Sequence, residues 1–376
     1  MLFKQSFLFA SSRMIDGGVG FLLTLTLIRQ IENETISSFN IISAVFGTVF
    51  LFLENGRSFD LLSSSFTEGL RILLRSLRIY FIFLILGILL LLMTLGGFEV
   101  LYFLILFNGL VNRLILSLHR EQSATIVLFI GVSALKVLLL LYAFITSFSI
   151  LYLFALFSIL DFLFQGISIY KRVFDSSLSA WVDDLRELIK ITRPGLILLN
   201  QLSFQVFLTV LTFFVSFGFV GVVKEFRLAL TMLSFYMLFH SSITVAYLMQ
   251  DGILKYLNLV VVSLAILSIP LSYLFIDFVL QGAKIDNQKL SFFVFLIAIE
   301  FLYLFYVTFL SLRSIYLLPP FSWVNVLSAL GIAIAYMVGI SFYLIFSLLI
   351  IFRLIIILFY GTKALNICLR YPTRSY

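Results

Sequence analysis

Apolar runs long enough to cross a bilayer recur along the whole sequence. They lie at about 7–30, 36–53, 79–98, 100–118, 124–145, 148–169, 194–217, 226–249, 256–280, 290–311, 318–339 and 341–361. Because about 20 apolar residues form one transmembrane helix, these runs predict an all-α integral membrane protein with about 12 transmembrane helices. The first run and the last two are the least sharply bounded, which gives a range of about ten to twelve. With 62% of its 376 residues hydrophobic and only 11% charged, the chain excludes a soluble fold.

The basic residues predict the side of the membrane on which each connection lies. Of the 25 Lys and Arg residues, three lie inside spans, and five lie in one set of alternate connections, namely Arg29, Lys224, Arg227, Lys284 and Lys289. The other 17 lie in the remaining connections and near the two ends of the chain. Because cytoplasmic connections are enriched in Lys and Arg, we expect both termini to be cytoplasmic. The net charge of +7 then reflects topology, and no nucleic-acid partner is expected.

Two long polar connections, at 54–78 and 170–193, both fall on the predicted cytoplasmic side. The second lies close to the middle of the chain. We therefore expect an N-terminal six-helix lobe at 1–170, a cytoplasmic amphipathic linker at 171–193 and a C-terminal six-helix lobe at 194–376, with a central cavity between the lobes. An offset of about 187 residues lays the first span over the seventh, and such internal repeats are common in secondary transporters.

Each long connection carries the pattern of a helix lying on the membrane surface. In the second, apolar residues recur at i, i+4 and i+8 beside charged residues, namely Trp181, Leu185 and Ile189. In the first, three basic residues share a face opposite two leucines, namely Arg71, Arg75 and Arg78 opposite Leu73 and Leu77. We expect both segments to be surface helices held by anionic membrane lipids.

Four charged residues lie inside the predicted spans of the first half. A charge in a bilayer costs at least a few kcal/mol, so it usually faces a partner or a watery cavity. Arg13 and Asp16 share one helix face and precede a glycine run. They either line a cavity, or Arg13 extends to the cytoplasmic headgroups with Asp16 as its partner. Lys136 is too deep to reach headgroups easily, so we expect a cavity position or a pair with Asp161, and that pair could be purely structural.

The second half contributes fewer charged residues within its predicted spans. Arg353, in the last predicted span, either extends toward the cytoplasmic headgroups or lines the cavity. Glu300 lies near the middle of the tenth span with no basic residue one turn away. It is a candidate for ion coupling, as is Asp161, or for a hydrogen bond between helices. Bonding between helices is also expected of the amides in the seventh span, Asn200, Gln201 and Gln205.

Residue patterns of catalysis are missing from the sequence. The single cysteine, Cys368, allows no intramolecular disulfide and no cysteine metal cluster. The two histidines, His119 and His240, lack the spacing of a zinc site, and neither a P-loop nor a G-x-S-x-G motif occurs. We therefore expect no cofactor, no metal and no enzymatic activity.

The layout of the spans resembles a known family. The first span carries Ala10-Ser11-Ser12-Arg13, Gly20-Phe21-Leu22-Leu23 and Leu27-Ile28-Arg29, and the join to the eighth span carries Phe217-Gly218-Phe219-Val220-Gly221-Val222-Val223 and Leu228-Ala229-Leu230. With the two halves and the cytoplasmic termini, this layout is similar to bacterial polysaccharide flippases of the O-antigen or capsule type, in the multidrug/oligosaccharidyl-lipid/polysaccharide exporter superfamily.

This resemblance implies a protein of the bacterial cytoplasmic (inner) membrane. Its two lobes would enclose a basic cavity and move a polyprenyl-diphosphate-linked oligosaccharide between leaflets by alternating access. Its partners would be that lipid-linked oligosaccharide, membrane lipids and polysaccharide assembly proteins. Two alternatives stay open: an ion-coupled antiporter for small molecules or drugs in the same superfamily, and a membrane polysaccharide polymerase or ligase.

Overall fold

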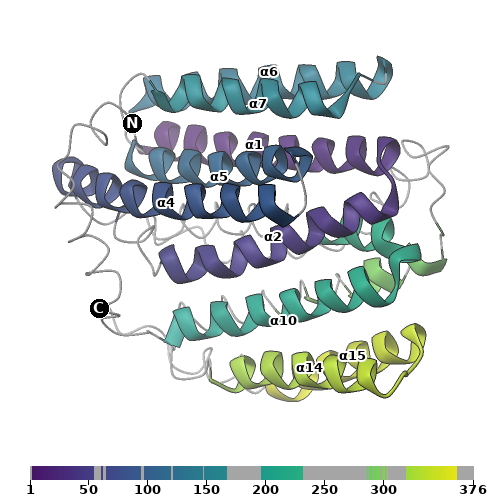
Figure 1. Ribbon diagram of the computed structural model, residues 1–376. Helices are drawn as coiled ribbons and strands as arrows, with labels where there is room; N and C mark the ends of the chain where they lie inside the picture. Colours follow the sequence, from purple (N-terminus) through teal and green to yellow (C-terminus); the bar gives the residue numbers. More distant parts are fainter. Residues whose placement is uncertain are drawn as a thin grey trace, which may run out of the picture. The chain divides into compact units, whose positions relative to one another are not determined.

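The computed structural model describes most of the predicted spans. The described residues are 2–54, 61, 65–94, 97–119, 122–146, 148–166, 196–231, 286, 288–290, 292–296, 299–300, 303 and 319–361. All regular structure in these ranges is helical, which confirms the all-α prediction (Figure 1). The described helices fall into two compact units.

The described part of unit 1 contains five helices. They are α1 (Leu2–Gln30), α4 (Phe66–Thr94), α5 (Gly97–Leu118), α6 (Ser123–Thr146) and α7 (Ile150–Gln165). Helix α1 packs along α6, α6 along α7, α7 along α5, and α5 along α4. The pairing of α6 with α7 is visible in Figure 1. Helix α5 is therefore held between α7 and α4.

Unit 2 contains α2 together with the described helices of the second half. They are α2 (Asn33–Glu54), α10 (Leu196–Gly218), the short 3-10 turn Val220–Val222, α14 (Pro319–Met337) and α15 (Phe342–Ile356), which continues as a π-helical turn over Ile357–Gly361. Helix α14 packs against both α10 and α15. Residues 31–51 thus group with the second half of the chain. The predicted linker 171–193 lies outside the described residues.

Five described helices are long and apolar enough to cross a membrane. They span Phe66–Thr94, Gly97–Leu118, Ser123–Thr146, Pro320–Met337 and Phe342–Phe359. A sixth candidate is the helix pair Leu202–Gly218 and Val220–Thr231, which is bent by 112°. Twelve transmembrane helices in two lobes stay a prediction. The paired prolines Pro319 and Pro320 begin α14, because the first turn of a helix does not use the backbone N–H that proline lacks.

Helix α4 joins two segments that the sequence analysis predicts as separate helices. It runs without a break from Phe66 to Thr94, so the predicted surface helix and the predicted third span are one helix. In its first part Leu73 and Leu77 are buried while Arg71 and Arg75 are exposed, as the pattern predicts. No glycine or proline interrupts 70–86, which explains why the helix continues.

Helix α6 exposes apolar residues and buries polar ones. In α6, Leu128, Leu135 and Leu138 are exposed, while Ser133 and Lys136 are buried. Water-soluble helices show the opposite arrangement. An apolar outer surface is what lipid tails would contact, so the polar interior groups must find partners within the unit.

Two connections that the charge distribution places outside the cell meet at one end of unit 2. The backbone N–H of Asp286 donates a hydrogen bond of 2.9 Å to Oε1 of Glu225. Asp286 also forms an ion pair of 3.1 Å with Lys289, and its Oδ1 accepts bonds from the backbone N–H groups of Gln288 and Lys289. These contacts show that the two connections share one end of the unit, and the side of the membrane on which that end lies stays a prediction.

Candidate functional site

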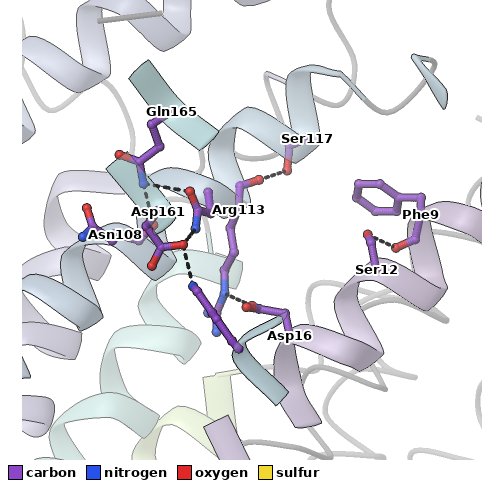
Figure 2. Close-up of polar contacts among 10 residues, drawn as sticks. Phe9, Ser12, Asp16, Asn108, Arg113, Ser117, Asp161 and Gln165 are labelled. Carbon is purple, nitrogen blue, oxygen red and sulfur yellow. Dashed lines mark hydrogen bonds and ion pairs between the residues drawn. The ribbon is translucent and has the colours of Figure 1, made fainter. Parts of the chain in front are cut away.

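The most polar part of unit 1 is an ionic cluster between α5, α6 and α7. Nζ of Lys136 lies 2.5 Å from Oδ1 of Asp161, and Nδ2 of Asn112 donates to the same oxygen at 2.7 Å. All three side chains are buried. The sequence-predicted pairing of Lys136 with Asp161 is thus present, and Figure 2 shows Asp161 at the centre of the contacts.

Further amides and hydroxyls extend this cluster. Nε2 of Gln165 donates to Oδ1 of Asn112 at 2.7 Å and to the carbonyl of Asn108 at 3.2 Å. The side-chain amide of Asn108 and the hydroxyls of Ser133 and Ser158 are buried without a hydrogen-bond partner in the structure. Since burying an unbonded polar group is costly, these groups are the sites at which ordered water would fit.

One cation of α5, Arg113, is exposed among buried neighbours. Arg113 is the only exposed residue between 110 and 118 of α5, and its side chain is 45% exposed. Its Nε lies 3.9 Å from Oδ2 of Asp16 on α1, whose side chain is 15% exposed (Figure 2). The distance is at the limit of an ion pair, so Asp16 holds Arg113 loosely. At 1.5 Å per residue, Arg113 lies about 8 Å inside the end of α5.

Unit 2 contains a second buried ionic cluster. Nε of Arg353 on α15 lies 2.8 Å from Oε1 of Glu300, and Nη1 of Arg353 donates to Oδ1 of Asn325 on α14 at 2.8 Å. Nδ2 of Asn325 in turn donates to Oγ of Ser203 on α10 at 3.1 Å. The contact with Glu300 lacks the angle of a hydrogen bond, so the attraction between the two charges holds it.

Aromatic rings enclose the guanidinium of Arg353. Its carbon Cζ lies 4.4 Å from the ring centre of Phe207 and 4.4 Å from that of Tyr303. The hydroxyl of Tyr303 donates to the carbonyl of Phe321 at 2.5 Å. Cation–π contacts are strongest where water is excluded, and Arg353 is fully buried. This cluster is therefore sealed, and Arg353 does not extend toward headgroups as one sequence interpretation expected.

The predicted site residues thus fall into two separate groups. Asp16, Lys136 and Asp161 lie in unit 1, whereas Glu300 and Arg353 pair with each other in unit 2. The side chain of Arg13 lies outside the described residues. The partner that the structure shows for Asp16 is Arg113, on another helix, and the expected pairing of Asp16 with Arg13 stays a prediction. Whether any of these residues contacts a transported molecule stays a prediction.

Sequence reasoning missed Arg113, Asn112 and Asn325. Arg113 was counted among the loop residues because it lies near the end of its span. The two asparagines carry no charge and so drew no attention, although each completes an ionic cluster. The usable signal was their position, since both lie well inside apolar spans where an amide needs a partner.

The charged and amide side chains described above are suited to binding and to helix packing. Within the described ranges, no three His, Cys, Asp or Glu side chains come together to hold a metal ion. The two buried clusters each pair one cation with one carboxylate, whereas the side chain of Arg113 within α5 is 45% exposed. Comparison with protein-family models, with curated proteins and with solved structures finds no match to this chain.

Proposed function

We propose that this protein is a flippase. It moves a polyprenyl-diphosphate-linked oligosaccharide, the repeat unit of a surface polysaccharide, across the bacterial cytoplasmic membrane by alternating access. The observation that carries the proposal is the half-exposed guanidinium of Arg113, which lies within a membrane-length helix and is only loosely held by Asp16. The resemblance of the span layout to polysaccharide flippases supports the same substrate class.

The physical requirement comes from the charge of the substrate. A diphosphate leaves the headgroup layer only if cations compensate its negative charge. Arginine suits this role because its planar guanidinium donates two parallel hydrogen bonds to phosphate oxygens and stays protonated. In the predicted topology Arg113 lies toward the cytoplasmic side, where such a lipid would enter. Because Asp16 lies 3.9 Å from Arg113, breaking this ion pair so that Arg113 can bind the diphosphate would cost little free energy.

A reconstituted transport assay tests the proposal. The purified protein is placed in liposomes with a fluorescent disaccharide linked to a polyprenyl diphosphate, and a membrane-impermeant quencher reports the outer-leaflet fraction over time. We expect the protein to speed flipping, and Arg113→Ala to slow it at least about tenfold, which corresponds to the loss of one charged hydrogen bond. The flipping rate of Arg113→Lys should lie between those of the wild type and Arg113→Ala, because lysine keeps the charge but cannot donate two parallel hydrogen bonds.

The control variant is Arg71→Ala, which removes an exposed arginine from the surface part of α4. It should transport as the wild type does. Flipping no faster than in protein-free liposomes would contradict the proposal. Equal transport of a matched lipid that lacks the diphosphate would contradict the role of Arg113. Uptake of small organic cations driven by an ion gradient, without flipping, would favour the antiporter alternative.

A further inference from the structure

The two buried ionic clusters have the same composition. In unit 1, Asn112, Lys136 and Asp161 come from three helices that follow one another in the chain. We call these three residues the first triad. In unit 2, Glu300, Asn325 and Arg353 form the second triad, from three helical segments that follow one another in the part of the chain that the structure describes. Each triad contains one cation, one carboxylate and one amide, and each is electrically neutral.

The two triads are also spaced alike along the sequence. The members on the corresponding helices are 188, 189 and 192 residues apart, for Asn112 and Glu300, Lys136 and Asn325, and Asp161 and Arg353. These separations agree with the offset of about 187 residues that aligns the first span with the seventh, as expected for internal repeats. A spread of only four residues over three helices indicates equivalent positions in two repeated units.

The roles within the triads are shifted by one helix. The amide lies on the first helix of the first triad and on the second helix of the second triad. The cation moves from the second helix to the third, and the carboxylate from the third to the first. A simple residue-by-residue alignment of the two halves therefore pairs asparagine with glutamate and lysine with asparagine, which conceals the repeat.

The physical reason for such a shift is that the bilayer penalises net charge. An unpaired charge inside a membrane protein is costly, whereas a paired and hydrogen-bonded group of zero net charge is tolerated. The penalty depends on the sum of the charges and on their contact, and not on which helix supplies which charge. Three helices that meet at one point can therefore exchange the roles while the cluster stays neutral.

We infer that the two triads are equivalent clamps, each of which fixes the packing of three helices in its repeat, and that Lys136 and Arg353 are positioning residues that do not contact the transported molecule. Both cations are buried and paired with the carboxylates of their own triads, whereas the side chain of Arg113 is 45% exposed. This inference concerns the fold of each unit, so it stands apart from the identity of the substrate.

A permuted variant of the first triad tests the equivalence. Asn112→Glu, Lys136→Asn and Asp161→Arg together give unit 1 the role order of unit 2. The matched control replaces only the first change by Asn112→Gln, which has the same shape but leaves the new arginine without a carboxylate. We expect the permuted variant to give at least about fivefold more folded monomer, measured by size-exclusion chromatography in detergent, because an unpaired buried charge destabilises strongly. Equal yields from the two variants would overturn the equivalence.

Neutral pair variants test the positioning role in both units, even if the permuted arginine does not fit. Lys136→Met alone should lower the yield of folded monomer, and adding Asp161→Asn should restore it. Arg353→Met and Glu300→Gln should behave in the same way in unit 2. The restored double variants should also flip the fluorescent diphosphate lipid within about twofold of the wild-type rate, since replacing a buried ion pair is often nearly neutral. Well-folded double variants that flip at least tenfold more slowly than the wild type would overturn the positioning role, whereas a wild-type protein that does not flip would contradict only the proposed function.

Discussion

Tyr303 contributes to the second triad through two separate parts of its side chain. Its ring lies against the guanidinium of Arg353, and its hydroxyl donates to the carbonyl of Phe321 on α14. The ring stabilises the positive charge of Arg353. The hydroxyl joins α14 to the segment that contains Tyr303. The two contributions are separable by substitution.

Substitutions at Tyr303 should therefore destabilise in two steps. Tyr303→Phe removes the hydrogen bond to the carbonyl of Phe321, which contributes about 0.5–1.5 kcal/mol to stability. Tyr303→Leu also removes the cation–π contact, which is worth up to about 2 kcal/mol more at a desolvated site. Apparent melting temperatures in detergent should fall in the order wild type, Phe, Leu. A Leu variant as stable as the Phe variant would show that the ring contact contributes nothing.

The Asp286–Lys289 pair predicts a pH dependence at the predicted outer end of unit 2. The hydrogen bond from Lys289 lowers the pKa of the Asp286 carboxyl below its ordinary 3.8, and the same bond raises the pKa of Lys289 above its ordinary 10.5. The stabilisation from Asp286 is therefore complete above pH 3.8 and is lost as the pH falls through the lowered pKa. That from Lys289 is complete below pH 10.5 and is lost as the pH rises through the raised pKa.

Asp286→Asn isolates the charge from the helix cap, because asparagine can still accept the backbone bonds. The small difference in melting temperature between the wild type and this variant should be constant at neutral pH and shrink toward both extremes. Melting curves from pH 3 to pH 11 measure it, with Lys289→Met as the companion variant. A difference that grows as the pH falls below 3.8 would contradict the assigned pair.

At the scale of the element, α4 and α5 approach closely at a glycine. A Cβ atom added to Gly87 would lie 2.6 Å from Cζ and 2.8 Å from Cε1 of the Phe103 ring. Small residues allow such close approach between membrane helices. Gly131, on α6, has no neighbouring atom within 4 Å of an added Cβ and provides a matched comparison.

Gly87→Ala should therefore destabilise unit 1, although alanine is the better helix former. Overpacking against Phe103 costs about 1–3 kcal/mol, which exceeds the gain of about 1 kcal/mol in helix propensity. Gly131→Ala should be neutral or slightly stabilising. Thermal unfolding of both variants in detergent checks the pair, and an equal effect at the two positions would show that the contact with Phe103 does not limit packing.

Most helix positions could be predicted from the sequence, whereas most side-chain contacts between helices could not. The apolar runs place α5, α6 and α10 within a few residues, because a bilayer requires about 20 apolar residues for each crossing. The run at 79–98 was placed less well, since the helix continues back to Phe66 through a polar segment. Hydropathy measures composition, and it does not detect the end of a helix.

The sequence predicts which side chains pair between helices only where a buried charge needs an opposite charge at similar depth. Lys136 needed a carboxylate at similar depth, and Asp161 was the available one. Arg353 and Glu300 are 53 positions apart on different helices, and nothing in their local sequence indicates that they meet. Contacts of this kind depend on how the helices rotate and pack, which the periodicity of one helix does not specify.

At the scale of the whole molecule, the charge distribution makes a testable statement about topology. In a Cys368→Ser background, Ser65→Cys should be labelled by an impermeant thiol reagent only from the cytoplasmic side, and Gln288→Cys only from outside. Both positions are exposed. A new cysteine near residue 180 should behave like Ser65→Cys. Labelling of Gln288→Cys from the cytoplasmic side would contradict the twelve-span arrangement.

Some contacts of α2 can form only after much of the rest of the chain has been synthesised. Oγ1 of Thr48 lies 2.8 Å from Oγ1 of Thr209, a residue made 161 positions later, and Asn40 accepts a bond from Arg227, which follows 187 positions after it. At about 5–20 residues per second, a ribosome needs roughly 8–40 s to supply these partners. During that interval Thr48 and Asn40 lack these two contacts. The protein-conducting channel or an insertase must shelter α2 until α10 arrives, so synonymous codon changes that slow translation between 54 and 196 should increase degradation of the nascent chain.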